Sequence, residues 1–125
     1  MKILDTDVLL DHLQGNSAAM QYLLAQINAN ETVALSVVTL AEVLSSVRYD
    51  EEAPINKLLG FFFVLDISES IARQASLYLR QFRASQSLDV SDALIAATVY
   101  FAGGTLITRN TKRYPMDDIT VVAPY

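Results

Sequence analysis

The stretch ILDTDVLLDHL, residues 3–13, changes from a strand-like into a helical pattern within its own length. We predict a short strand that ends at Leu4 and a helix that begins at Thr6. Three aspartates interrupt this apolar segment: Asp5, Asp7 and Asp11. Asp5 directly follows the predicted strand, where the chain of an α/β fold leaves the sheet and where such folds place their functional sites. The other two aspartates are expected to be partly exposed on the helix.

Outward from this stretch, short β-rich runs alternate with longer segments of helical period. This alternation is typical of βαβ units and of a parallel sheet. We predict further strands over residues 33–35, 62–67, 105–108 and 119–122. Further helices are predicted to begin at Ser17 and to cover residues 39–47, 55–61, 69–84 and 92–102. The chain is therefore predicted to form a single α/β domain, residues 1–125, around a central parallel sheet.

Apolar spacing within the predicted helices indicates which faces are buried. The helix that begins at Ser17 is expected to face the core with Met20, Leu23, Leu24 and Ile27. The helix over residues 69–84, with Ser68 as its N-cap, is expected to face the core with Ile71, Ala75, Tyr78 and Phe82. The helix over residues 92–102 is nearly uncharged, which predicts burial on most of its sides.

The composition predicts a compact fold that needs no disulfide and no zinc thiolate. Apolar residues make up 52% of the chain, charged residues make up 18%, and there is no cysteine. The N-terminal aspartates interrupt any signal-peptide pattern, and no stretch has the length and apolar character of a membrane span. We therefore expect a cytoplasmic protein without membrane contact. The net charge of −5 argues against a nonspecific nucleic-acid binder, because phosphate contacts come from Lys and Arg.

Three acidic residues are predicted to meet at one edge of the sheet. Asp5 follows the first strand, Glu42 lies in the first turn of the helix after the second strand, and Asp92 begins the nearly uncharged helix. In a parallel sheet these strand-to-helix turns share the edge at the carboxyl ends of the strands. Carboxylates gathered there repel one another, and no Lys or Arg is adjacent to any of them in sequence. Their hard oxygen atoms predict a Mg²⁺ or Mn²⁺ site rather than a zinc site.

Each of these acids has an alternative role as part of a helix cap. Asp5 can cap the helix that follows it, and Thr39 with Glu42 has the spacing of a capping box. Asp89 can cap the helix that carries Asp92. Both explanations stay open for each residue taken singly, whereas the three acids taken together favour a cation site.

Four stretches of the chain resemble the PIN-domain ribonucleases, in particular the VapC-type toxins of prokaryotic toxin–antitoxin pairs. They are ILDTDVLLDHL, SVVTLAEVL, SDALIAATVYFAGGTLITRNTKRYP and ITVVAP, in the family's order between Lys2 and Pro124. The resemblance implies the PIN fold, a three-layer α/β/α arrangement around a central parallel sheet. It also implies metal-dependent endonucleolytic cleavage of RNA, with a 5′-phosphate and a 3′-hydroxyl as products.

The resemblance assigns roles to individual residues of this chain. The acidic positions that hold Mg²⁺ or Mn²⁺ and carry catalysis match Asp5, Glu42 and Asp92. Thr6 and Thr108 match small hydroxyl residues that line the pocket. The fourth acidic position of many members is Asn110 here, whose amide oxygen can bind a metal ion or its water but brings no charge. Asp89 is a candidate for an extra carboxylate, although the N-cap role is favoured for it.

The segment TRNTKR, residues 108–113, places three cations beside the matched position Asn110. These are Arg109, Lys112 and Arg113. We predict that they contact RNA phosphates, so that the mouth of the site is positive although the whole chain is acidic. The resemblance further implies a small antitoxin protein as partner and a homodimer.

Two other functions match parts of the pattern. The triplet Asp5-Thr6-Asp7 after a strand matches the D-x-D signature of haloacid-dehalogenase-like phosphatases. That family also needs a Lys and a late acidic pair after a strand, whereas the late strand here leads into TRN. A catalytically silent PIN-like scaffold is the second alternative, which the missing fourth acid favours. His12, the only histidine, is expected to be solvated and without a catalytic role.

Overall fold

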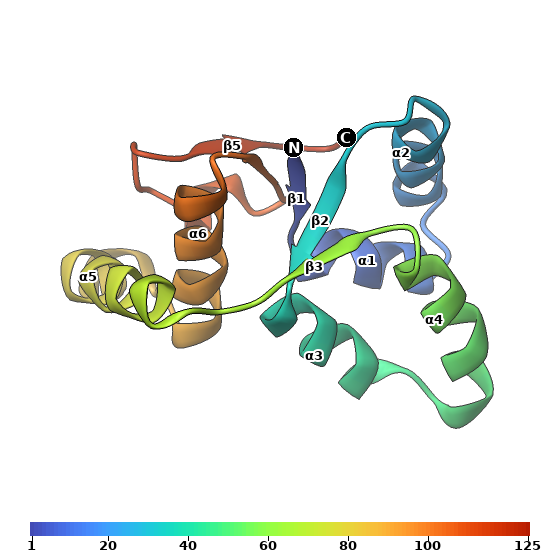
Figure 1. Cartoon of the computed structure of the whole chain (residues 1–125), viewed down its shortest axis with the longest axis horizontal. Coiled ribbons are helices and arrows are strands. Elements are labelled where there is room, and N and C mark those ends of the chain that lie inside the picture. The colour runs from blue at the N-terminus through green and yellow to red at the C-terminus, as the bar shows by residue number, and fades with distance from the viewer.

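Five parallel strands form one sheet in the computed structural model, which describes residues 1–125. The strand order is β3-β2-β1-β4-β5, so the first strand of the chain lies at the centre of the sheet (Figure 1). The strands are β1 (Lys2–Leu4), β2 (Val33–Ser36), β3 (Phe63–Leu65), β4 (Thr105–Ile107) and β5 (Thr120–Val122). The predicted parallel sheet is confirmed, although β3 is shorter than expected.

Helices cover both faces of this sheet, which gives the expected three-layer α/β/α fold. α5 and α6 lie on one face, whereas α1, α2 and α4 lie on the other (Figure 1). α3 packs against both cores, through Val38 on one side and Val43 on the other. The helices are α1 (Thr6–Leu13), α2 (Ser17–Asn28), α3 (Val37–Ser46), α4 (Glu52–Leu59), α5 (Glu69–Gln86) and α6 (Val90–Ala102), with the 3₁₀ turns η1 (Tyr49–Glu51) and η2 (Thr111–Arg113).

Alternate residues of the central strands build two separate cores. Ile3 of β1 and Leu106 of β4 pack with α5 and α6, while their neighbours Leu4 and Ile107 pack with the helices of the opposite face. All four side chains are at most 2% exposed. This alternation follows from the two-residue period of a strand. Truncation of Leu4 or Leu106 to Ala would therefore cost about 2 to 5 kcal/mol of unfolding free energy.

α6 begins and ends at residues with a clear capping function. Asp89 caps its N-terminus, and Gly103 at its C-terminus has a φ of 72°, a left-handed conformation that glycine adopts without strain. Residues 95–99 are all buried, as the lack of charge predicted, because α6 packs between α5 and the sheet. α6 is thus a rigid support for the residues at its first turn.

α5, the longest helix, follows its predicted pattern. The Ser68 hydroxyl accepts a 3.2 Å hydrogen bond from Ile71 N, which confirms the predicted N-cap. Ala75 and Tyr78 are buried, and Phe82 packs against the same core. Neither α5 nor any other helix combines the length and the apolar character that a membrane crossing requires.

The start of α3 differs from the prediction. This helix begins at Val37 rather than at Thr39, because the Ser36 hydroxyl caps it by accepting a 3.1 Å hydrogen bond from Val38 N. Ser36 is therefore both the last residue of β2 and the N-cap of α3, so the helix follows the strand without an intervening loop.

α2 and α4 also differ from their predicted patterns. In α2, Met20 and Leu24 are 45% and 50% exposed, so the predicted apolar face packs only through Leu23 and Ile27. α4 begins at Glu52 instead of residue 55. Pro54 is compatible with this earlier start, because the N–H groups of a first helical turn have no partner within the helix.

Candidate active site

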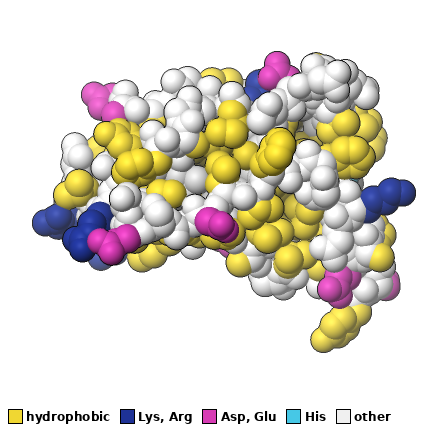
Figure 2. All heavy atoms as spheres, in the orientation of Figure 1, with side chains coloured by type: hydrophobic (Ala, Val, Ile, Leu, Met, Phe, Trp, Pro, Cys, Tyr) yellow, Lys and Arg dark blue, Asp and Glu magenta, His cyan; other side chains and the backbone are white.

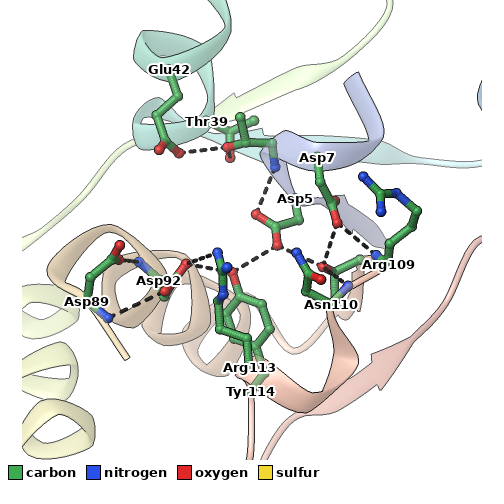
Figure 3. A network of polar contacts seen from close by, with 12 residues as sticks. Asp5, Asp7, Thr39, Glu42, Asp89, Asp92, Arg109, Asn110, Arg113 and Tyr114 are labelled. Carbon is green, nitrogen blue, oxygen red and sulfur yellow. Dashed lines mark hydrogen bonds and ion pairs between the residues drawn. The ribbon is translucent and has the colours of Figure 1, made fainter. Parts of the chain in front are cut away.

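The residues that follow β1 and β4 meet residues of α3 and α6 at the carboxyl end of the sheet (Figure 3). Together they line a hollow of about 190 Å³. Its lining residues are Asp5, Thr6, Asp7, Leu10, Glu42, Asp92, Asn110 and Arg113. The fold thus brings Asp5, Glu42 and Asp92 to one place from three separate elements.

Asp5 is buried at this site and is held by donors of its own chain. Its Oδ1 accepts a 2.8 Å hydrogen bond from Thr6 N, so Asp5 is the N-cap of α1. Its Oδ2 accepts hydrogen bonds from the hydroxyls of Thr108, at 2.8 Å, and Tyr114, at 2.9 Å. Asp5 is therefore both a cap and a residue of the hollow. Thr108 was predicted to line the pocket, but it is fully buried and supports Asp5 from behind the lining residues.

Glu42 reaches the hollow from the second turn of α3, not from the first. Its Oε1 accepts a 2.7 Å hydrogen bond from the Thr6 hydroxyl, and the hydroxyls of Thr6 and Thr39 lie 3.4 Å apart. The predicted capping box of Thr39 and Glu42 is wrong, because α3 begins two residues earlier and buries Thr39 within the helix. Thr6, a predicted pocket residue, instead holds Glu42 near Asp5.

Asp89 and Asp92 form a reciprocal capping box at the start of α6. Asp92 N donates to Asp89 Oδ1 at 2.8 Å, and Asp89 N donates to Asp92 Oδ2 at 3.4 Å. Asp89 is exposed, whereas Asp92 is buried and lines the hollow. Burial and the nearby Asp89 carboxylate raise the pKa of Asp92 to about 6. The site therefore holds a buried carboxylate whose negative charge is poorly compensated.

Tyr114, which no sequence motif singled out, links two of the acids. It is 4% exposed, and its hydroxyl lies 2.9 Å from Asp5 Oδ2 and 3.4 Å from Asp92 Oδ1. Burial and these two carboxylates raise the pKa of Tyr114, which keeps its hydroxyl protonated as a donor. The sequence signal that could have identified Tyr114 is its position directly after the basic residues 112 and 113. A large aromatic side chain after an exposed turn is often buried.

A second hollow of about 210 Å³ lies beside the acids and is lined only by residues of the segment after β4. The lining residues are Arg109, Asn110, Thr111, Lys112 and Arg113. Lys112 is exposed, and Asn110 and Arg113 line both hollows. The basic segment thus lies next to the acidic hollow, as its position in the sequence predicted.

The guanidinium of Arg109 is engaged by an acid of α1. Its Nη2 donates to Asp11 Oδ1 at 2.9 Å and its Nε donates to Asp11 Oδ2, while the Tyr125 hydroxyl donates to Asp11 Oδ2 at 2.6 Å. Burial alone would raise the pKa of Asp11, but these donors lower it. Asp11 is therefore buried in an ion pair. The prediction that it would be partly exposed is wrong. This pair fixes the segment after β4 to α1.

Asp7 and His12 are both half-buried on α1, which confirms the predicted partial exposure of Asp7. Asp7 Oδ2 accepts a 3.0 Å hydrogen bond from Arg109 N, while its Oδ1 is buried without a partner. Burial and the neighbouring Asp5 raise the pKa of Asp7. His12 is half-buried, and its Nδ1 is buried without a partner, so the predicted solvated position is wrong. It lines a different hollow, next to α4.

The atoms that the acidic hollow offers are those that a hard divalent cation binds. Asp5, Glu42 and Asp92 supply carboxylates and Asn110 supplies an amide oxygen. In the present arrangement, however, no three acidic or histidine side chains converge as a metal-ion site. Hydrogen-bond donors and a guanidinium of the chain lie against the carboxylates instead. The donor chemistry fits Mg²⁺ or Mn²⁺, while the chain's own donors hold the carboxylates in place.

Comparisons with known sequences agree with this architecture. The family model described as PIN domain matches residues 2–119. Ribonuclease VapC19 of Mycobacterium tuberculosis is 35% identical over 117 residues, which cover 93% of this chain and 94% of that protein. Ribonuclease VapC10 of the same organism is 36% identical over 93% of this chain and 87% of its own length.

Solved structures show the same fold. A toxin–antitoxin complex from Klebsiella pneumoniae matches with a TM-score of 0.78 at 32% identity, covering 100% of this chain and 98% of that one. VapBC-1 from nontypeable Haemophilus influenzae matches in fold with a TM-score of 0.79 at 21% identity, covering 98% and 97% of the two chains. With the α/β/α layers and the three acids at the carboxyl edge of the sheet, these matches show that the chain belongs to the PIN-domain family.

Proposed function

We propose that this protein is a Mg²⁺- or Mn²⁺-dependent endoribonuclease and the toxin of a toxin–antitoxin pair that acts in the cytoplasm. The observation that carries the proposal is the meeting of Asp5, Glu42 and Asp92 at one hollow, next to a basic one. Relatives named as ribonucleases, at 35% and 36% identity, support the class of reaction. The similar chain from a Klebsiella pneumoniae toxin–antitoxin complex supports the biological role.

In this proposal the chain's carboxylates hold and orient the metal ion. Asp5, Glu42 and Asp92 would hold the ion, and Asn110 would add a neutral oxygen. When bound there, a divalent cation would lower the pKa of a water molecule and would offset charge that develops on the scissile phosphate. Thr108 and Tyr114 orient Asp5 through its Oδ2. A carboxylate of the cluster accepts the proton of the attacking water.

The basic hollow is the proposed binding site for the RNA backbone. Lys112 is exposed and Arg113 lies at the boundary of the two hollows, so both can contact phosphates beside the acids. Arg109 contributes mainly through its position, because Asp11 holds its guanidinium. The positive charge is thus local, which makes RNA binding compatible with the net charge of −5.

We also propose an antitoxin protein as partner and a homodimer. Hydrophobic side chains lie over much of the face shown in Figure 2, and several large hydrophobic side chains of the chain are exposed. They include Phe61, Phe63, Leu77 and Phe101. Exposed apolar area of this kind is typical of protein interfaces. Light scattering of the isolated chain, and of the chain coexpressed with the adjacent open reading frame, tests both partners.

RNA cleavage by the purified protein tests the proposed reaction. Cleavage of single-stranded or structured RNA is expected with Mg²⁺ or Mn²⁺ and not with EDTA. Asp92→Asn should lower the rate by at least about two orders of magnitude, as the loss of a metal ligand does. Asp117→Asn, which changes an exposed acid that lines neither hollow, should cleave like wild type.

One observation favours a catalytically silent scaffold as the second candidate: the three acids line one hollow, but in the present arrangement no three acidic side chains are grouped so that they could hold one metal ion. Absence of RNA cleavage in every metal would favour that scaffold and contradict the nuclease. Hydrolysis of p-nitrophenyl phosphate without cleavage of RNA would instead favour the phosphatase reaction that the Asp5-Thr6-Asp7 triplet allows.

A further inference from the structure

One basic side chain, that of Arg113, forms an ion pair with the acid cluster, which consists of Asp5, Glu42 and Asp92. Arg113 Nη1 lies 3.6 Å from Asp92 Oδ1, and no other Lys or Arg forms an ion pair with Asp5, Glu42 or Asp92. Figure 3 shows the Arg113 side chain reaching between Asp92 and Asp5. The chain therefore partly neutralises its own site.

This ion pair is held loosely. Its 3.6 Å separation exceeds the about 2.8 Å of a charge-assisted hydrogen bond, and no hydrogen bond joins Arg113 to Asp92. The Arg113 side chain is 48% exposed, whereas the Asp92 side chain is 8% exposed. Arg109 provides the contrast, because it holds Asp11 through two hydrogen bonds. Arg113 can thus leave its acid at much lower cost than Arg109.

The position of Arg113 gives its side chain a second place to bind. Arg113 and Asn110 line both the acidic and the basic hollow. The backbone of Arg113 is anchored in η2, where its N–H donates to Asn110 O at 3.0 Å. A rotation of the side chain alone therefore suffices to turn the guanidinium from one hollow to the other.

We propose that Arg113 is the resident counter-ion of the acid cluster, and that a divalent cation must displace it from Asp92. The displaced guanidinium then faces the basic hollow, where it binds a substrate phosphate. This inference rests on the proposed metal-dependent function. A dication is attracted to the three carboxylates more strongly than one guanidinium is attracted to Asp92, because the Coulomb attraction scales with the charges. Arg113 consequently lowers metal affinity in the free protein and couples metal binding to phosphate binding.

Calorimetric titration of the full chain with Mg²⁺ alone, and with Mn²⁺ alone, tests the displacement. Arg113→Ala is expected to tighten metal binding by about three- to tenfold, because the competing charge is removed. Lys112→Ala is the matched control: it removes the same charge from the same turn, but its side chain lines only the basic hollow. It should change metal affinity by less than about twofold. Arg113→Lys, which keeps the charge, should bind metal more weakly than Arg113→Ala.

A second measurement reports the side chain directly. The ¹⁵N–¹H signal of the Arg113 Nε group should shift on addition of Mg²⁺ to wild type. In Asp92→Asn, which removes the paired charge, the signal should lie at the shifted position before any metal is added. A signal that does not shift at Mg²⁺ concentrations at which calorimetry shows wild type to bind the ion would overturn the displacement.

The outcomes separate this inference from the proposed function. Wild-type metal binding with equal or weaker binding by Arg113→Ala overturns the counter-ion and leaves the metal-dependent nuclease standing. Metal binding by Arg113→Ala together with undetectable binding by wild type supports the counter-ion. No binding by wild type or by any variant overturns both the counter-ion and the metal dependence of the proposed function.

Discussion

Tyr114 donates a 2.9 Å hydrogen bond to Asp5 Oδ2 across 109 residues of chain, from a side chain that is 4% exposed. The bond joins the end of η2 to the end of the central strand β1. It places a neutral donor against a buried carboxylate. A hydrogen bond of this kind stabilises the buried negative charge of Asp5 without a positively charged partner.

Tyr114→Phe should lower the free energy of unfolding by about 1 to 2 kcal/mol, because Asp5 loses a buried donor. Urea unfolding measured by circular dichroism gives this value. Tyr49→Phe is the control, since Tyr49 is 97% exposed and its hydroxyl forms no hydrogen bond within the chain. Equal stability of Tyr114→Phe and wild type would show that the bond contributes nothing to the fold.

The ion pair of Asp11 and Arg109 should couple by about 1 to 2 kcal/mol in a double-mutant cycle, because it is two-pronged and Asp11 is mostly buried. The cycle uses Asp11→Asn, Arg109→Ala and the double variant in urea unfolding. The pair of Glu69 and Arg73, exposed on α5, is the matched reference and should couple by only about 0.3 to 0.5 kcal/mol. Equal coupling in the two pairs would contradict a structural role for Arg109.

The contribution of Asp92 to the free energy of unfolding of the metal-free protein should increase as the pH falls from about 7 to about 5. Its pKa is raised to about 6 in the folded chain, so the folded state binds a proton that the unfolded state does not yet bind. The contribution is about 1 to 2 kcal/mol. The difference between wild type and Asp92→Asn isolates it, measured by urea unfolding at several pH values in EDTA. Parallel curves for the two proteins would rule out the raised pKa.

Lys112→Ala should reduce the salt dependence of RNA binding by roughly one unit of slope, because one phosphate contact is lost. Fluorescence anisotropy with a labelled RNA in EDTA measures the slope without cleavage. Lys57→Ala, which changes an exposed lysine of α4, should leave the slope unchanged. An unchanged slope for Lys112→Ala would show that Lys112 is a solvated surface residue that contacts no phosphate.

The sheet and the meeting of the acids were predictable because both depend on local patterns. The strand period of two sends Ile3 and Leu4 to opposite cores, and an acid directly after a buried strand must emerge at the carboxyl edge. Contacts between distant segments were not predictable in this way. The bonds from Tyr114 to Asp5 and from Arg109 to Asp11 join residues 109 and 98 positions apart, and no local period encodes such pairs.

The cap of α3 shows how a correct local pattern can still mislead. Thr39 and Glu42 have the spacing of a capping box, but Ser36 lies three residues earlier and is an equally good N-cap. Two β-branched residues between them, Val37 and Val38, favour strand by propensity. Because β2 ends at Ser36, Ser36 and not Thr39 caps the helix. The earlier start of α3 places Glu42 in its second turn, where the Glu42 side chain lines the hollow.

The capping box of Asp89 and Asp92 has a consequence for how this chain evolves. One of its two carboxylates is buried at the site, so the start of α6 carries a charge that the helix itself does not need. Asn at this position would keep a side-chain oxygen that can accept from Asp89 N, without that buried charge. A population selected only for heat resistance would accumulate Asp92→Asn, whereas retention of the aspartate in a lineage would record selection on the chemistry of the hollow.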